Sequence, residues 1–262
     1  MSTTISIRSM SCSTSPRGIA AVVGVGPKLG RSVACKFAHE GYTVAILARD
    51  LGNLSRLAEE IALEAKAQVF AIRMDCSDSK SVREAFEGVL SLGFVEVLVY
   101  NACEPPAASP PTSFAAVTLH SFERSLAVSA VGAFHCAQHV IPGMAERGRG
   151  TIIFTGSSAS LIGFAGRCEL SCGKFALRGL SQCLAREFQS SGIHVVHAVI
   201  DGVIGLASAR GRSSRGEQSP TLVDPDAIAQ TYWHIHTQKK GAWTQEIDLR
   251  ASIDSPTSTG AV

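Results

Sequence analysis

Short apolar segments alternate with amphipathic helical segments through most of this chain of 262 residues. The apolar segments are near-continuous runs of Val, Ile, Leu and Ala, as expected for strands that are buried on both faces. The expected strands are residues 18–26, 43–49, 68–76, 95–102, 150–157, 193–201 and 242–249, and the expected helices are residues 30–41, 53–65, 81–92, 118–147, 166–191 and 228–236. The alternation predicts one α/β domain, in which a doubly wound parallel sheet of about seven strands carries helices on both faces.

The two ends and one internal stretch differ from this pattern. Residues 1–17 are rich in Ser and Thr and hold no acidic residue, which is typical of a disordered tail or of a short organelle transit peptide. Residues 205–224 are rich in Gly, Ser and Arg, and loops of this length usually carry binding function. We therefore expect a folded domain over residues 18–250 with a substrate loop at 205–224, and a C-terminal tail at 251–262.

Composition excludes several classes of function. The formal net charge is only +2 and the charges are dispersed, so a nucleic-acid surface is not expected. No run of 18 apolar residues is present, so we expect no membrane span. We expect a cytoplasmic protein, and the alternative is targeting to an organelle through the Ser-rich N-terminus. The eight cysteines fall within apolar segments and are expected to be reduced. Cys168 and Cys172 lack further ligands at fitting spacing, so we predict no metal site.

A glycine-rich turn joins the first expected strand to the first expected helix. Gly24, Gly26 and Gly30 allow close approach of the backbone to a ligand, while Lys28 and Leu29 complete the turn. In this strand–turn–helix context, such a turn is typical of a site that holds a dinucleotide pyrophosphate at the helix amino end. The sequence therefore predicts a Rossmann-type nucleotide-binding domain.

The end of the second strand indicates which nucleotide is preferred. Sites that favour NAD place an acid there to bind the ribose 2′-hydroxyl. Here Ala48 is followed by Arg49, which can pair with a 2′-phosphate, and Lys28 adds a second cation. NADP(H) is therefore favoured over NAD(H), although a shift of one residue would bring Asp50 to the critical position and leave NAD(H) open.

The span 18–250 resembles the short-chain dehydrogenase/reductase family. The motif residues that carry the resemblance are Gly24 and Gly30 in the turn, Asp75 after the third strand, Asn101 and Ala102 after the fourth, Ser157 after the fifth, and Lys174 in the helix that follows. The resemblance implies that the turn, Arg49, Asp75, Cys76, Asn101, Ala102, Lys174 and Ile204 bind the cofactor. It also implies that Ser157 and Lys174 are catalytic, that the substrate is a small carbonyl or alcohol, and that the protein is a homodimer or homotetramer.

The chain departs from the family pattern where a proton is transferred. The family's catalytic tyrosine stands four residues before the lysine, where this chain has Leu170, and no tyrosine occurs between Tyr100 and Tyr232. A phenol beside an ammonium group can deliver a proton near neutral pH, whereas a leucine cannot. The proton donors that remain possible are a water bound to Lys174, a group on the substrate, or the side chains of Ser171, Cys172 and Glu169. On a helix, these three side chains point away from position 170. Three smaller departures are Cys103 and Lys28 in place of glycines and Ser129 in place of an asparagine.

Three functional interpretations remain. The first is an NADP(H)-dependent oxidoreductase with a non-standard proton relay. The second is a non-redox enzyme on the same scaffold, such as an isomerase or a cyclase, with a structural nucleotide. The third is a nucleotide-binding pseudoenzyme. We favour the first because Ser157 and Lys174 are both present.

Overall fold

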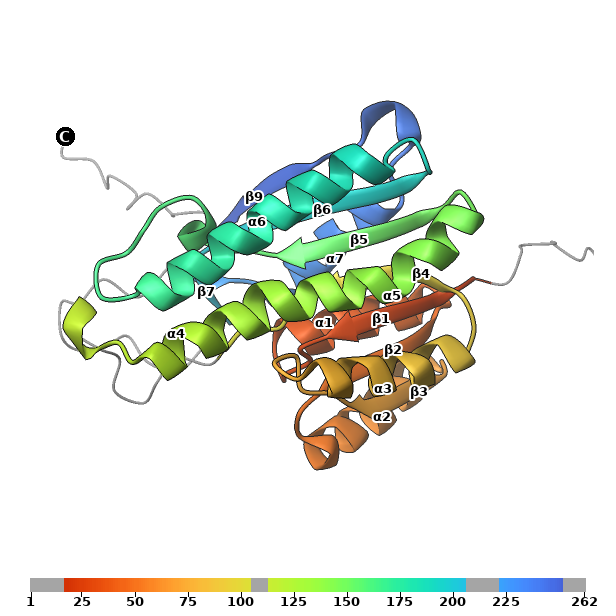
Figure 1. The fold of residues 1–262 in the computed structure, drawn as a ribbon. Coiled ribbons are helices and arrows are strands. Elements are labelled where there is room, and N and C mark those ends of the chain that lie inside the picture. Colours follow the sequence, from red (N-terminus) through yellow and green to blue (C-terminus); the bar gives the residue numbers. More distant parts are fainter. Residues whose placement is uncertain (1–16, 105–112, 206–221, 252–262) are drawn as a thin grey trace, which may run out of the picture.

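A parallel sheet of seven strands forms the centre of the computed structural model (Figure 1). The structure describes residues 17–104, 113–205 and 222–251. The strands of the sheet are β1 (Ile19–Val23), β2 (Thr43–Ala48), β3 (Val69–Arg73), β4 (Val95–Tyr100), β5 (Gly150–Thr155), β6 (Ile193–Asp201) and β9 (Glu246–Arg250). They lie in the order β3-β2-β1-β4-β5-β6-β9, so the winding of the chain reverses between β1 and β4. Ligands of open parallel sheets bind at such a reversal, beyond the carboxyl ends of the strands.

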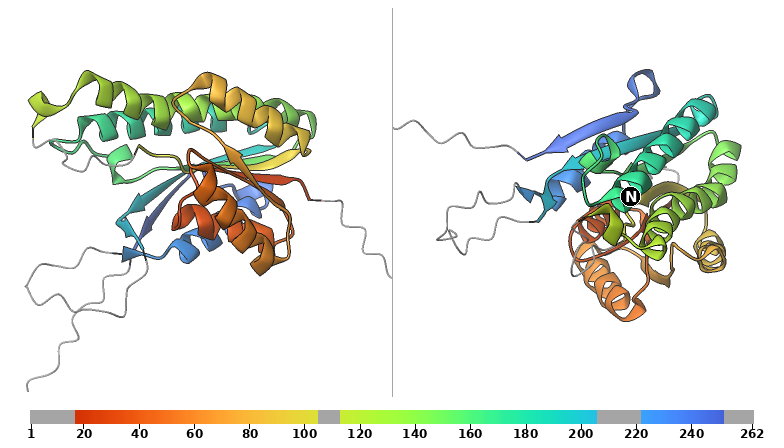
Figure 2. Two further views of the ribbon diagram at one scale, coloured as in Figure 1. Left: turned by 90° about the horizontal axis from the view of Figure 1, so that it is seen from below. Right: turned by 60° about the vertical axis from the view of Figure 1, so that its left-hand side comes forward.

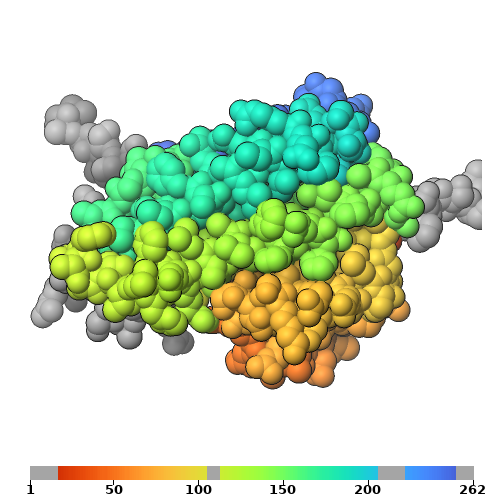
Figure 3. Space-filling model, viewed as in Figure 1, coloured from red at the N-terminus to blue at the C-terminus, as the bar shows by residue number. Residues whose placement is uncertain are grey.

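Helices cover both faces of the sheet, which gives three layers when the molecule is seen from below (Figure 2). The helices are α1 (Leu29–His39), α2 (Leu51–Ala65), α3 (Ser79–Ser91), α4 (Leu119–Leu126), α5 (Gly132–Glu146), α6 (Cys168–Phe188) and α7 (Pro225–His236). α1, α2 and α7 share one apolar core with the sheet, and α3, α5 and α6 share the other. Figure 3 shows α3, α5 and α6 side by side over the second face.

The two cores explain why the inner strands are largely apolar, whereas the edge strands β3 and β9 are partly exposed. Along β1, for example, all five residues are buried, and successive side chains enter opposite cores. Only Thr43 and Ala48 at the two ends of β2 are partly exposed. The predicted architecture of a doubly wound parallel sheet with about seven strands and helices on both faces is confirmed.

The predicted helical region over residues 118–147 is confirmed, and a π-helical turn at Ala127–Val131 joins α4 to α5 within it. The hydroxyl of Tyr100 donates a hydrogen bond to the carbonyl of Val128 in this turn. Immediately beyond it, a Cβ at Gly132 would lie 2.5 Å from the Cys76 carbonyl oxygen, so the backbone passes very close to the end of β3. The hydroxyl of a strand residue thus satisfies a carbonyl in the widened turn, and wide turns of this kind are frequent near functional sites.

The region after β6 contains a short element that the sequence did not predict. β7 (Val203–Ile204) pairs with β8 (Leu222–Val223) and forms a separate two-stranded sheet. Asp224 caps the helix that follows, because its carboxylate accepts a hydrogen bond from the Asp226 amide, and Pro225 is the first helical residue. Most of the predicted substrate loop, residues 206–221, lies outside the described residues, as do residues 1–16 and 252–262 of the predicted tails. In the described part of the chain, no helix has the length and apolar character needed to span a membrane.

Candidate functional site

Two adjoining cavities open at the carboxyl ends of β1, β4 and β5. The larger has a volume of about 510 Å³ and the smaller of about 270 Å³, and they share Gly24, Gly26, Asn101 and Cys103 in their walls. Predicted site residues in the larger cavity are Gly24, Gly26, Lys28, Leu29, Gly30, Asn101, Ser157, Leu170, Lys174 and Ile204. Predicted site residues in the smaller cavity are Gly24, Gly26, Arg49, Asp75, Cys76, Asn101 and Ala102. The structure therefore brings the predicted cofactor-binding residues, together with Ser157 and Leu170, to one groove.

The glycine turn is held tightly against the end of β4. Gly24 has a φ of +80°, and a Cβ at this position would lie 2.5 Å from the Ala102 backbone. The side-chain amide of Asn101 donates a hydrogen bond of 3.0 Å to the Gly24 carbonyl, which fixes the turn. At Gly30, a Cβ would lie 2.7 Å from the Cα of Val25. Glycine is therefore required at both positions for packing and not only for access to a ligand.

The same turn leaves open space on its ligand side. A Cβ at Gly26 would meet no atom within 4 Å. Among the described residues, no side chain caps the amino end of α1, which begins directly after Lys28. An uncapped helix amino end beside open space is well suited to a phosphate group. The residues present thus fit the pyrophosphate of a dinucleotide.

Lys28 crosses from the glycine turn to the short sheet that follows β6. Its ammonium group donates a hydrogen bond of 2.8 Å to the carbonyl of Ile204. The two residues are 176 positions apart in the chain and both line the larger cavity. The lysine therefore places a positive charge at the mouth of the larger cavity and connects its two sides.

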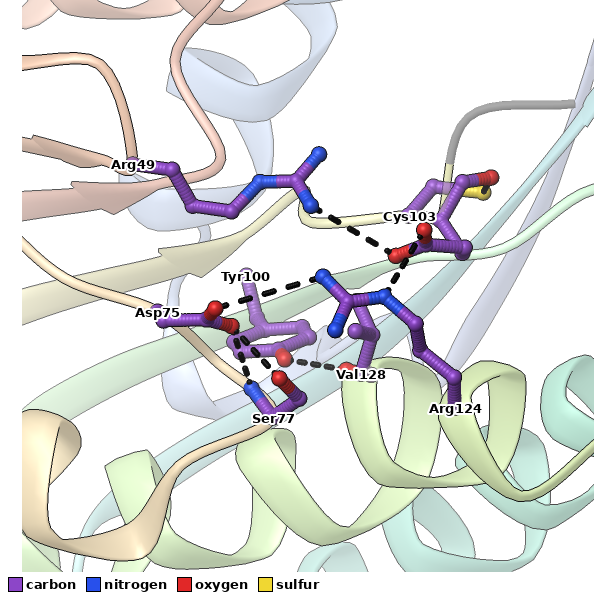
Figure 4. A network of polar contacts seen from close by, with 8 residues as sticks. Arg49, Asp75, Ser77, Tyr100, Cys103, Arg124 and Val128 are labelled. Atoms are coloured by element: carbon purple, nitrogen blue, oxygen red, sulfur yellow. Dashed lines mark hydrogen bonds and ion pairs between the residues drawn. The ribbon is translucent and has the colours of Figure 1, made fainter. Parts of the chain in front are cut away.

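Arg49, at the end of β2, belongs to a network of four charged side chains around the smaller cavity (Figure 4). Its guanidinium lies 3.8 Å from a carboxylate oxygen of Glu104. The other carboxylate oxygen of Glu104 accepts a hydrogen bond of 3.0 Å from Arg124 of α4. Arg124 also lies 3.9 Å from the carboxylate of Asp75. The network joins the ends of β2, β3 and β4 to α4.

Asp75 is further fixed by the turn that follows β3. One of its carboxylate oxygens accepts hydrogen bonds from the backbone amide of Ser77 at 2.9 Å and from the Ser77 hydroxyl at 2.7 Å. Partial burial raises the pKa of Asp75, but these hydrogen bonds and the charges of Arg124 and Arg49 outweigh burial and lower it. Asp75 is therefore an anionic acceptor on the wall of the smaller cavity.

Lys174 of α6 is buried at the floor of the larger cavity. Only 4% of it is exposed, and its ammonium group donates a hydrogen bond of 2.8 Å to the carbonyl of Thr155 at the end of β5. Burial lowers the pKa of Lys174, while the neighbouring Cys103 acts in the opposite direction. A buried ammonium with one backbone acceptor retains donor capacity for a ligand in the cavity.

Ser157 and Leu170 stand near this lysine in the wall of the same cavity. Ser157 begins a short 3₁₀ turn, and its backbone amide donates a hydrogen bond of 3.2 Å to the Ser160 hydroxyl. Leu170 lies one helical turn before Lys174, is partly buried and offers only an apolar surface. Ser157, Lys174 and Leu170 thus contribute a hydroxyl, an ammonium group and an apolar side chain to the wall of this cavity.

The three tyrosines form hydrogen bonds elsewhere in the fold, and none of them lines either cavity. The hydroxyl of Tyr42 is hydrogen-bonded to His236 at 2.6 Å, and that of Tyr232 to the Thr155 hydroxyl at 2.9 Å. Tyr100 donates to the carbonyl of Val128. Burial raises the pKa of all three phenols well above the usual value. No tyrosine is thus placed to transfer a proton in the groove.

The helix residues beside Leu170 do not supply an evident replacement. The Ser171 hydroxyl is buried and accepts a hydrogen bond of 3.2 Å from the Phe164 amide. Cys172 is exposed, and neither Cys172 nor Glu169 lines the groove. Cys103, by contrast, lines both cavities and is exposed. Of the seven cysteines that the structure describes, only Cys103 lines the larger cavity together with Ser157 and Lys174.

The cysteines that the structure describes are unpaired and form no metal centre. Seven are free thiols, and Cys35, Cys136 and Cys76 are buried or half-buried. Over residues 17–104, 113–205 and 222–251, no group of three or more His, Cys, Asp or Glu side chains is arranged to hold a metal ion. Cys168 and Cys172 accordingly belong to no such group.

Sequence reasoning missed two charged residues of the site. Glu104 and Arg124 both belong to the network around Arg49, yet neither lies in a motif. They are 20 residues apart in the chain and meet only because α4 folds back over the end of β4. An acid directly after the Asn101 turn was the one signal in the sequence that could have drawn attention to Glu104.

Comparison with known proteins gives consistent results. A family model described as short chain dehydrogenase matches residues 18–218. The chain is 30% identical over 233 residues to sorbitol-6-phosphate 2-dehydrogenase of Escherichia coli strain K12, covering 87% of this chain and 88% of that protein. It is 31% identical over 189 residues to 3-oxoacyl-[acyl-carrier-protein] reductase of Staphylococcus epidermidis, covering 71% and 74%. Among solved structures, a short-chain dehydrogenase from Rhodopseudomonas palustris matches with a TM-score of 0.76 at 28% identity, covering 90% of this chain and all of that one.

Proposed function

The chain belongs to the short-chain dehydrogenase family, and from this premise we propose that it is an NADP(H)-dependent oxidoreductase of a small carbonyl or alcohol substrate. The observation that carries the proposal is the single groove in which the glycine turn, Arg49, Ser157 and Lys174 all take part. The bound cofactor would supply or accept the hydride. The described residues must then hold it, orient the substrate and manage the proton.

The cofactor is held by residues from five parts of the fold. The glycine turn and the amino end of α1 would take the pyrophosphate, with Lys28 beside them. Asp75, Cys76 and Ala102 line the smaller cavity, where the adenosine would lie. Lys174 would hydrogen-bond the nicotinamide ribose, and Asn101 and Ile204 complete the wall.

Preference for NADP(H) is proposed from the charges at the end of β2. Ala48 carries no negative charge there, and Arg49 is half-exposed at the edge of the smaller cavity. A guanidinium in this position can pair with a 2′-phosphate in two-point geometry. Asp50, the residue that would favour NAD(H), is instead the N-cap of α2 and accepts a hydrogen bond from the Asn53 amide. Asp50 therefore has a structural function at the start of this helix.

The proton step is the non-standard part of the proposal. By the family's sequence pattern, the tyrosine is expected at the position of Leu170. The chain's three tyrosines are buried and line neither cavity. Ser157 can polarise a substrate carbonyl, and the ammonium of Lys174 can hold and orient a water molecule that delivers the proton to the substrate oxygen. A relay through water is slower than a positioned phenol, so we expect low turnover or a narrow range of substrates.

The experiment is a fluorescence titration with NADPH and NADH, followed by a panel of carbonyl substrates. The panel contains ketose phosphates and 3-oxoacyl thioesters, together with simple aldehydes and ketones. The first two are chosen because the relatives are named for sorbitol 6-phosphate and for a 3-oxoacyl-[acyl-carrier-protein]. Lys174→Met should abolish turnover. Lys80→Met, which removes an exposed lysine of α3, should leave turnover unchanged. Failure of the wild-type protein to bind either nucleotide would contradict the proposal.

The same experiment separates the two other interpretations. An isomerase or a cyclase with a structural nucleotide would convert substrate with no change in nicotinamide absorbance. A pseudoenzyme would bind the nucleotide tightly and turn over no member of the panel. Assembly as a homodimer or homotetramer, a folded domain over residues 18–250 and a cytoplasmic location complete the proposal, and light scattering and limited proteolysis test the first two.

A further inference from the structure

Glu104 lies in the groove as an anion next to the cation that a 2′-phosphate needs. We propose that Glu104 is a specificity-determining residue, whose carboxylate competes with the 2′-phosphate for Arg49 and thereby weakens the preference for NADP(H). This inference rests on the proposed function, because it concerns the same nucleotide site. It assigns a function to a residue that lies in no motif of the sequence.

The two contacts of Glu104 differ in kind. Toward Arg124 it makes a hydrogen bond of 3.0 Å, whereas toward Arg49 the closest atoms are 3.8 Å apart. At 3.8 Å, the contact between Glu104 and Arg49 is an ion pair without a hydrogen bond. The oxygen that faces Arg49 is also buried and has no hydrogen-bond partner among the residues that the structure describes. Glu104 is thus anchored by Arg124 and attracts Arg49 only through its charge.

Two consequences follow for an incoming phosphate. Arg49 can turn from Glu104 to the phosphate without breaking a hydrogen bond, because none joins the two side chains. Glu104, however, stays in place, because Arg124 holds it. Its negative charge therefore remains close to the phosphate and repels it, an effect that NAD(H) does not experience.

The balance of charge around the smaller cavity supports this effect. Arg49 and Arg124 contribute two positive charges, while Asp75 and Glu104 contribute two negative charges. A phosphate monoester adds between about −1.5 and −2 near neutral pH. Removal of the charge of Glu104 leaves one unpaired positive charge for that group. The four side chains are 26% to 49% exposed, so solvent screens the interaction only in part.

The test is to measure ligand affinities by isothermal titration calorimetry for the 262-residue protein and its Glu104→Gln variant. The ligands are NADPH, NADH and two fragments, adenosine 2′,5′-bisphosphate and adenosine 5′-monophosphate. We expect Glu104→Gln to bind NADPH and the bisphosphate about tenfold more tightly, a change of about 1.4 kcal/mol. Its affinity for NADH and the monophosphate should stay within about twofold of wild type, and the gain should shrink at high salt.

Two further variants isolate the pairing with Arg49. When Glu104→Gln is added to an Arg49→Gln variant, the gain in affinity for NADPH should be much smaller than in the wild-type background. The reason is that the guanidinium for which Glu104 and the 2′-phosphate compete is absent. Glu123→Gln removes an exposed acid next to Arg124 that takes no part in the network, so it should leave all affinities unchanged. Circular dichroism checks that each variant is folded. The salt dependence of NADPH binding by the wild-type protein is a further measurement, which requires no substitution.

The outcomes distinguish this inference from the proposed function. A selective gain that depends on Arg49 supports it. An equal change for both nucleotides, a gain also seen in Glu123→Gln, or no gain in Glu104→Gln overturns it. If wild type prefers NADH, the proposed cofactor preference is wrong, although a selective gain would still support the function of Glu104. If wild type binds none of the four ligands, both are overturned.

Discussion

Replacement of Leu170 by tyrosine should place a phenolic proton donor in the groove. Leu170 lines the larger cavity one helical turn before Lys174, so the new phenol would point into the space where Ser157 and Lys174 meet. Side chains four apart on a helix have Cβ atoms about 5–6 Å apart. At about 5 Å and an effective dielectric constant of about 20, a unit charge stabilises the phenolate by about 3 kcal/mol. The pKa of the phenol should therefore fall from about 10 to about 8.

This shift sets both the size and the pH dependence of the effect. A positioned general acid contributes about 10²–10⁴-fold to rate, so kcat for carbonyl reduction should rise at least about 100-fold in Leu170→Tyr. Reduction requires the protonated phenol. The new activity should therefore be present below the apparent pKa and decrease as the pH rises through about 8.

The assay is the loss of NADPH absorbance with the most reactive substrate of the panel, measured from pH 6 to pH 10. Leu170→Phe is the matched control, because it adds the same ring without the hydroxyl and should give no gain. NADPH affinity should be similar in wild type and both variants. A folded Leu170→Tyr protein that binds NADPH yet reduces no faster than Leu170→Phe would refute the reasoning about position 170.

Three further predictions concern the turn, the buried histidines and the edge of the sheet. Gly24→Ala should lose NADPH binding and about 2–4 kcal/mol of stability in urea unfolding, because its Cβ would lie 2.5 Å from backbone. Gly26→Ala, with no atom within 4 Å of the new Cβ, should lose binding but stay within about 0.5 kcal/mol. Burial lowers the pKa of His236 from 6.5 to about 4, so the unfolded chain binds a proton first as the pH falls. Stability measured by urea unfolding should therefore decrease from pH 6.5 toward pH 4, by up to about 3 kcal/mol, and His236→Gln should show a flatter profile. Glu246→Ala should cost about 2 kcal/mol in thermal unfolding, because it removes the acceptor of two hydrogen bonds from Arg178 and the partner that lies 3.0 Å from buried His197. Asp248→Ala on the same strand, where the described partner is exposed Arg250, should cost little.

The sheet and the cofactor side of the groove could be predicted because their signals are local. Each buried strand is a continuous apolar run, and the turn with Gly24 and Gly30 follows the first of them directly. Once the strands are parallel and in this order, the residues after their carboxyl ends must meet at one edge. That rule alone brings Arg49, Asp75, Asn101 and Ser157 together, although they are far apart in the chain.

The features that escaped prediction depend on contacts between distant side chains. Glu104 has no meaning in the sequence until Arg124 and Arg49 approach it from two other elements. The π-helical turn at Ala127–Val131 likewise needs the hydroxyl of Tyr100 as an outside partner, and helical periodicity does not record such a partner. Local sequence patterns predict helices and strands well, but they do not predict which side chains pair across a groove.

The central place of β1 in the sheet has a consequence for the order in which the protein assembles. β1 is made first, but it pairs with β4 as well as with β2, so one of its edges has no partner until residues 95–100 have been synthesised. The glycine turn is completed later still, because the side-chain amide of Asn101 and the backbone of Ala102 both pack against Gly24. Pairing of strands far apart in sequence slows folding and leaves edges exposed meanwhile. On the ribosome, the nucleotide groove therefore forms only after residues 95–102 have emerged, and a chain stopped before β4 would present an apolar strand edge to chaperones.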